Sequence, residues 1–237
     1  MSNNWFQFKK FKIYQDKTAM KIGVDGVLLG AVSHFEKVAT ILDIGAGTGL
    51  LSLMAAQKTN AEIIALEIEK NAFKQCLENI KLNKQENKIS GLNISFQDYY
   101  KNTNKKFDFI ISNPPFFENS QKSANINRNT ARHSDYLPKE ELIKGVSEIL
   151  KPKGLFSIIL PFEFENSFEH LCLKYGLFCS YKMIILPKEN KSANRIIFEF
   201  SYQNSTTISE KFIIRETDTN QYTKTYKELT KDFYLHF

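Results

Sequence analysis

The stretch from Ala39 to Gly49, ATILDIGAGTG, decides the fold of this chain. Its first half is a short apolar run of the kind that forms a buried strand, and its second half is a glycine-rich turn. The run 48–58 that follows has the character of a helix. Glycines let the backbone approach a ligand closely, and the start of a helix offers unpaired N–H groups. The order of strand, glycine loop and helix predicts the ligand-binding edge of an α/β sheet.

The same alternation extends along the chain. We expect strands at 39–45, 62–68, 92–98, 107–113 and 154–161, and helices at 48–58, 69–83 and 138–151. Such alternation predicts a mostly parallel sheet with helices on both faces. Two later runs, 181–188 and 195–202, flank a polar loop and are expected to pair as a C-terminal antiparallel hairpin. The expected sheet therefore has seven strands.

Composition limits the class of protein. The chain has 237 residues, a length that suits one α/β domain over 1–237, and its net charge is +6. We divide it into a basic, aromatic N-terminal segment (1–36), a catalytic core (37–203) and a C-terminal extension (204–237). Three cysteines without CxxC spacing and four scattered histidines favour a reducing cytoplasm and no metal site. No apolar run approaches the length needed to span a bilayer. We also expect the protein to be a monomer.

An acid next to the glycine loop indicates which ligand the loop binds. The glycines Gly45, Gly47 and Gly49 run G-x-G-x-G, whereas a dinucleotide fold prefers G-x-G-x-x-G. Asp43 stands two residues before the first of them. A carboxylate there would repel a pyrophosphate, which argues against a nicotinamide oxidoreductase, but it suits a ligand with ammonium and sulfonium centres. S-adenosylmethionine is such a ligand.

In these residues the sequence resembles the class I methyltransferases, whose fold is Rossmann-like. The resemblance implies S-adenosylmethionine as cofactor and places Asp43 and the three glycines around it. It also implies that Glu67, at the end of the next expected strand, hydrogen-bonds both ribose hydroxyls. Asp98, at the end of the third expected strand, would read the adenine amino group. For Asp98 alone, a solvated loop position is an equally good interpretation.

The fourth expected strand ends in Asn113-Pro114-Pro115-Phe116-Phe117. Two consecutive prolines fix the backbone and remove two amide donors, so the loop is stiff. Here the resemblance narrows to the Asn-Pro-Pro-aromatic methyltransferases, which methylate a nitrogen conjugated to a π-system. It implies that the Asn113 side-chain oxygen and the Pro114 carbonyl each accept one N–H of the target amine. Phe116 would stack on the target ring.

Three branches of that group differ in substrate: adenine N6, guanine N2 of ribosomal RNA, and glutamine N5 of release factors. The last two usually carry an extra N-terminal domain, for which the 42 residues before Asp43 leave no room. The runs MKIGVDGVLLGA (20–31), SNPPFFENS (112–120) and NRNTARHSDYL (127–137) resemble the bacterial family that forms N6-methyladenosine at position 37 of a valine tRNA. The usual aromatic of that family is Tyr where this chain has Phe116. A non-catalytic RNA-binding protein of the same fold is the alternative from another class.

The resemblance also places Asp25, in the run 20–31, near the methionine end of the cofactor. An N-cap for the helix that follows is an equally good interpretation of this residue.

The positions of the basic residues indicate which of them suit contacts with RNA phosphates. Lys9, Lys10 and Lys12 are interleaved with aromatic residues, a pattern suited to RNA phosphates with occasional base stacking. A segment that packs its aromatics on the domain, with solvated lysines, explains the same pattern. The chain has 28 lysines but only four arginines, so Arg128, Arg132 and Arg195 near the expected site are our candidates for bidentate phosphate contacts with a tRNA substrate.

Overall fold

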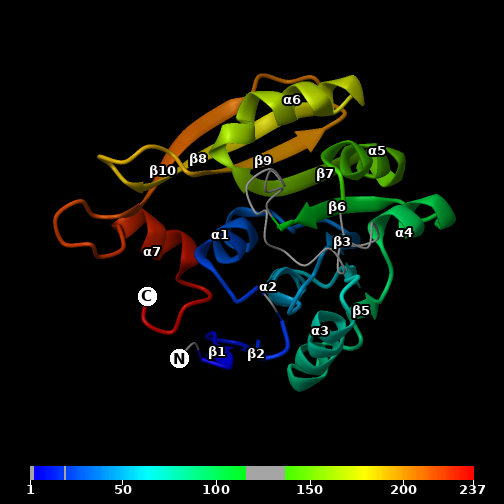
Figure 1. Ribbon diagram of the computed structural model, residues 1–237, viewed down its shortest axis with the longest axis horizontal. Helices are drawn as coiled ribbons and strands as arrows, with labels where there is room; N and C mark the ends of the chain where they lie inside the picture. The colour runs from blue at the N-terminus through cyan, green and yellow to red at the C-terminus, as the bar shows by residue number, and fades with distance from the viewer. Residues whose placement is uncertain (1–2, 19, 116–136) are drawn as a thin grey trace, which may run out of the picture.

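A computed structural model of the chain describes residues 3–18, 20–115 and 137–237. Its main feature is an eight-stranded sheet in the order β10-β8-β9-β7-β6-β3-β4-β5 (Figure 1). The strands are β3 (Thr40–Ile44), β4 (Glu62–Leu66), β5 (Ile89–Leu92), β6 (Phe107–Ser112), β7 (Leu150–Pro161), β8 (Phe178–Lys188), β9 (Arg195–Ser201) and β10 (Ile208–Arg215). Strand β3, which leads into the glycine loop, lies inside the sheet and pairs in parallel with β4 and β6.

Helices cover both faces of this sheet, as the alternation predicts. They are α1 (Val24–Val32), α2 (Leu50–Lys58), α3 (Lys70–Leu82), α4 (Phe96–Asn102), α5 (Lys139–Ile149), α6 (Glu165–Lys174) and α7 (Lys224–Thr230), with a 3₁₀ turn at Phe162–Phe164. Alternate residues of β4 belong to different apolar clusters: Ile63 lies in the cluster that includes residues of α1, α2 and α7, whereas Ile64 lies in the cluster that includes residues of α4, α5 and α6. Successive strand side chains point to opposite faces, so the strands of this central region are buried on both sides.

Two sequence expectations about strands were wrong. The sheet has eight strands and not seven, because β10 from the C-terminal extension pairs in parallel with β8. The third strand of the chain's sheet ends at Leu92, and the run 96–102 is a helix. The reason is local: Ser95 caps α4, since its hydroxyl accepts a hydrogen bond from the backbone N–H of Asp98. The expected hairpin of β8 and β9 is confirmed as antiparallel.

The N-terminal segment forms a small separate sheet of β1 (Trp5–Gln7) and β2 (Lys12–Tyr14). Phe8, Phe11 and Ile13 are buried in the main apolar cluster. The backbone N–H of Lys9 donates to the carbonyl of Phe233, so the hairpin lies against the C-terminal residues (Figure 1). The segment therefore packs several of its aromatics on the domain while Lys9 and Lys10 stay exposed. Among the described helices, none is long and apolar enough to cross a membrane.

Candidate active site

A cavity of about 550 Å³ lies at the carboxyl ends of β3, β4 and β6. Parallel strands end at the same edge of a sheet, which is where open α/β sheets place their ligands. The cavity is lined by Lys17, Thr18, Met20, Ile44, Gly45, Gly47, residues 66–69, Asn71, Ala72, residues 94–97, residues 112–115 and Leu137. Four sequence-predicted segments thus meet here: the glycine loop, the turn after β4, the region of residues 94–97, and the Asn-Pro-Pro turn.

The glycine loop adopts a backbone that other residues avoid. Gly45, Gly47 and Gly49 have φ of +73°, +56° and +84°. A Cβ at Gly45 or Gly47 would meet nothing within 4 Å, so these two glycines are needed for backbone conformation and leave the cavity side open. Gly49 does not line the cavity; a Cβ there would lie 3.0 Å from Cys76 Sγ of α3. Its absence of a side chain lets α2 begin against α3.

Asp43 lies beneath this loop and is fully buried. Its Oδ2 accepts hydrogen bonds from the backbone N–H and the hydroxyl of Ser52, at 3.1 and 2.7 Å. Its Oδ1 is buried without a hydrogen-bond partner among the described residues. Burial raises the pKa of Asp43 to about 7, against the lowering effect of the Ser52 hydrogen bonds. Asp43 does not itself line the cavity, and it lies directly before the glycine loop that does.

Glu67 lines the cavity at the end of β4. Its Oε2 accepts a hydrogen bond from Gly47 N–H, and its Oε1 accepts one from Glu69 N–H, both at 2.8 Å. The carboxylate thereby ties the glycine loop to the turn after β4. A carboxylate oxygen can accept a further hydrogen bond, so both oxygens keep acceptor capacity for a ligand hydroxyl.

Asn113 and Pro114 form the wall of the cavity where β6 ends. Gly26 of α1 packs beside the Asn113 amide: a Cβ there would lie 3.5 Å from Asn113 Nδ2, an ordinary contact, but only 2.9 Å from Leu50 Cδ2, so the glycine makes room for Leu50. The glycine of the VDGVL run thus has a packing reason that periodicity did not reveal. Phe116, Arg128 and Arg132 lie outside the described residues.

Asp25 and Arg195 form an ion pair, with Arg195 Nε 2.8 Å from Asp25 Oδ2. The N-cap interpretation of Asp25 was wrong: the residue lies inside α1, and the N-cap is Gly23, which offers no side chain. The pair joins α1 to the start of β9, and neither residue lines the cavity. Arg195 also donates to the carbonyl of Asn194.

Asp98 does not line the cavity either. It lies in the first turn of α4, where the hydroxyl of Ser95 donates to its Oδ2 at 2.6 Å. Its neighbour Gln97 does line the cavity and was missed by sequence reasoning. The signal was available, because Ser followed three residues later by an acid marks a helix start and would have placed 96–98 in a first turn.

The residues present fit S-adenosylmethionine. The cavity volume is in the range of small-molecule sites. Its lining combines apolar side chains with the Glu67 carboxylate, and the buried Asp43 carboxyl group beneath the loop has an unpartnered Oδ1. Both favour a ligand with a positive centre, hydroxyls and a flat heterocycle. Within the described residues, no group of three or more His, Cys, Asp or Glu side chains could hold a metal ion.

Comparison with known proteins identifies the family of the chain. Residues 25–163 match the Methyltransferase small domain family. The chain is 42% identical over 236 residues to a tRNA1(Val) (adenine(37)-N6)-methyltransferase of Bacteroides fragilis, covering 99% of both chains. It is 40% identical to a protein of the same name from Christiangramia forsetii, again over 99% of both.

Solved structures show the same fold at low sequence identity. A predicted O-methyltransferase of Agrobacterium tumefaciens superposes with a TM-score of 0.66 at 18% identity, covering 88% of this chain and 96% of that one. A structure of Pyrococcus horikoshii TYW2 in complex with MeSAdo has a TM-score of 0.55 at 18% identity, covering 82% and 70%. The Rossmann-like fold is therefore confirmed. The chain belongs to the methyltransferase small domain family and, within it, to the tRNA1(Val) (adenine(37)-N6)-methyltransferases.

Proposed function

We propose that this protein transfers a methyl group from S-adenosylmethionine to the exocyclic N6 of an adenine in tRNA, at position 37 of a valine tRNA as the relatives' names state. The observation that carries the proposal is the meeting of Gly47, Glu67, Asn113 and Pro114 around one cavity. Phosphate binding alone has no use for the two acceptors that Asn113 and Pro114 offer, which argues against a non-catalytic RNA-binding protein.

The chain's own groups account for cofactor binding. S-adenosylmethionine, when bound, supplies an electrophilic methyl group on a sulfonium centre. Glu67 would accept hydrogen bonds from the ribose hydroxyls. Its carboxylate oxygens still have lone pairs for this, besides those that accept from the N–H groups of Gly47 and Glu69. Asp43 would contribute negative charge from below, and Gly45 and Gly47 would let the backbone approach closely. Gln97, on the cavity wall, is the better-placed candidate to contact the adenine, whereas Asp98 points its carboxylate at Ser95.

Asn113 and Pro114 would prepare the target amine. The N6 lone pair of adenine is delocalised into the ring, so the amine is a poor nucleophile. The Asn113 side-chain oxygen and the Pro114 carbonyl would each accept one N–H, which steers the nitrogen towards tetrahedral geometry and aims its lone pair at the methyl group. With the amine held in this way, its nitrogen would take the methyl group in exchange for the C–S bond of the cofactor and would release its proton to solvent. The rate acceleration would come from the orientation of the amine and from hydrogen-bond acceptors held in fixed positions, so no strong base is required.

Lys9, Lys10, Lys12 and Arg195 remain our candidates for phosphate contacts, with Arg128 and Arg132 outside the described residues. Lys9 Nζ donates to the main-chain oxygens of Lys231 and Phe237, at 2.6 and 2.8 Å. Its ammonium is still exposed and has a third proton to donate. A monomer acting in the cytoplasm, without a metal ion, completes the proposal.

The test is to incubate the protein with unmodified valine tRNA and methyl-labelled cofactor, digest to nucleosides and identify the labelled product by mass spectrometry. Label in N6-methyladenosine supports the proposal. Label in N2-methylguanosine, or in glutamine of a release factor offered as alternative substrate, would overturn it, as would calorimetry that shows no cofactor binding.

For the mechanism, Asn113→Ala should abolish turnover while cofactor affinity is kept. Asn102→Ala, which removes an exposed amide in α4, is the matched control. Retained turnover in Asn113→Ala would remove that residue from its role.

A further inference from the structure

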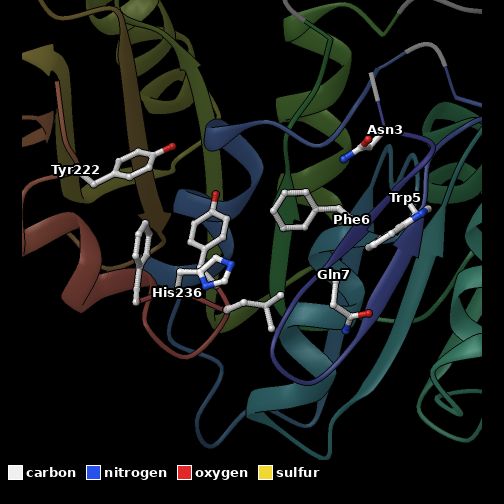
Figure 2. Close-up of a pocket in the computed structure, with 9 residues that line it drawn as sticks. Asn3, Trp5, Phe6, Gln7, Tyr222 and His236 are labelled. Atoms are coloured by element: carbon white, nitrogen blue, oxygen red, sulfur yellow. The ribbon is translucent and has the colours of Figure 1, made fainter. Parts of the chain in front are cut away.

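A second pocket lies away from the catalytic cavity, between the N-terminal hairpin and the C-terminal residues (Figure 2). Its volume is about 410 Å³. It is lined by Asn3, Trp5, Phe6, Gln7, Tyr222, Tyr234, Leu235, His236 and Phe237. Figure 2 shows Phe6 and Trp5 on the side of the hairpin and Tyr222 and His236 on the side of the C-terminal segment.

Aromatic rings form most of the wall. The rings of Phe6 and Tyr234 lie 6.0 Å apart, and Phe237 lies 5.2 Å from Tyr234 and 5.3 Å from Tyr222. These rings hold one another in place through edge-to-face contacts. Trp5 is 44% exposed, so a large part of its indole is open to a ligand. The pocket thus offers rigid, flat, apolar surfaces, the kind on which a planar heterocycle stacks.

Each side of the pocket carries a cation against one of its rings. Lys12 Nζ lies 4.3 Å from the centre of the Trp5 ring, and Arg215 Cζ lies 4.0 Å from the centre of the Tyr222 ring. Among the described residues, no aspartate or glutamate lines the pocket. An apolar peptide would gain nothing from these cations, whereas a nucleotide carries a phosphate beside its base. The charges therefore complement a nucleic acid strand.

The hairpin segment also leads to the catalytic cavity. Lys17 and Thr18, a few residues after β2, line that cavity. The backbone N–H of Lys17 donates to Gln75 Oε1 of α3, which fixes this part of the segment. One continuous stretch of chain therefore contributes to both pockets, and from Trp5 to Lys17 it can span at most roughly 40 Å. This distance is short enough for one RNA molecule to place its target base in the catalytic cavity and another base in the aromatic pocket.

We propose that the aromatic pocket binds an unpaired nucleobase of the RNA substrate, stacked on Trp5, at a site separate from the catalytic cavity. The proposal rests on the proposed function, since it takes RNA as the substrate. The base binds by its flat face, and Lys12 and Arg215 meet the flanking phosphates. The pocket then sets affinity for RNA and leaves the chemical step unchanged.

Trp5 is the single tryptophan of the chain, so its fluorescence reports this pocket alone. The first experiment titrates the cofactor-free protein with an unmodified anticodon stem-loop RNA and, in parallel, with a blunt RNA duplex of equal length. Stacking predicts saturable quenching by the stem-loop and little by the duplex. Equal quenching by both RNAs, or none by either, would overturn the proposal.

The second experiment uses Trp5→Ala and Trp5→Phe. Base–aromatic stacking is worth about 1–3 kcal/mol, so Trp5→Ala should raise the KM for tRNA on the order of tenfold. Its kcat at saturating tRNA and its cofactor affinity should not change, and Trp5→Phe should restore most of the KM. Leu173→Ala removes a comparably exposed apolar side chain from α6 and is the control.

An unchanged KM in Trp5→Ala would defeat the inference even if the wild-type protein methylates tRNA normally. If the wild-type protein methylates no tRNA, the proposed function fails, and the fluorescence titration still decides whether RNA binds this pocket.

Discussion

Replacing Asp43 by Asn should change how the stability of the cofactor-free protein depends on pH. Burial raises the pKa of Asp43 from its ordinary value of 3.8 to about 7. The folded protein therefore binds this proton more tightly than the unfolded chain does. Its stability falls as pH rises through the window from about 4 to 7, and the loss is complete above that window.

The magnitude follows from the two pKa values. At 1.36 kcal/mol per pKa unit, the full loss is about 4 kcal/mol, of which about 2 kcal/mol occurs between pH 5.5 and 8.5. The amide introduced by Asp43→Asn carries no titrating proton, so the variant avoids this loss. The amide group that replaces the unpartnered Oδ1 adds a cost of its own, but that cost is the same at both pH values and cancels in the comparison.

The assay is urea denaturation of both proteins at pH 5.5 and 8.5. We expect the wild-type protein to lose about 2 kcal/mol more than Asp43→Asn between the two conditions. Asp108→Asn is the control: burial raises the pKa of Asp108, but hydrogen bonds from Lys151 and Thr40 outweigh this and hold it below its ordinary value. Its effect on stability should be equal at both pH values. Parallel pH profiles for wild type and Asp43→Asn would refute the reasoning.

Three other changes test the packing around the site. Lys58→Met removes an ammonium that donates to three carbonyls at the end of α1 and should cost about 2–3 kcal/mol in urea denaturation; a loss below about 0.5 kcal/mol would contradict a capping role. Gly145→Ala places a methyl group 2.5 Å from the Phe96 ring and should cost about 1–3 kcal/mol, read as a lower Tm; an unchanged Tm would show that α5 can shift freely. A double-mutant cycle on Asp25 and Arg195 should give a coupling of about 0.5–1 kcal/mol, and additive single-variant effects would show that the pair contributes nothing.

The sequence predicted the parts of the fold that depend on local signals. The alternation of apolar runs and the glycine spacing located β3 and α2 within a few residues, and Glu67 and Asn113 lie around the cavity because both end parallel strands. The wrong expectation of a strand over 92–98 also had a local cause. Leu92, Ile94 and Phe96 alternate like a strand, and this pattern outweighed the capping signal of Ser95, although tertiary packing buries only Phe96 of the three.

Other features depend on contacts between distant residues, which no local pattern contains. Arg195 and Asp25 are 170 positions apart in the sequence. The ion pair formed by Arg195, which we expected to bind phosphate, could therefore not be foreseen. The parallel pairing of β10 with β8 is set by the packing of the extension through Phe212 and α7. The aromatic pocket is of the same kind, since its two sides come from opposite ends of the sequence.

The contact between the hairpin and the C-terminal segment has a consequence for how the protein is made. Lys9 bonds to Lys231, 222 positions later, and Phe8 lies in one cluster with Phe233. During synthesis on the ribosome, the hairpin therefore emerges early but cannot complete its packing until almost all of the remaining chain has been translated. Lys17 and Thr18, which line the catalytic cavity, belong to that same segment. The neighbouring strands β6, β3, β4 and β5 can pair while the chain grows, but the aromatic pocket between the hairpin and the C-terminal segment is completed late.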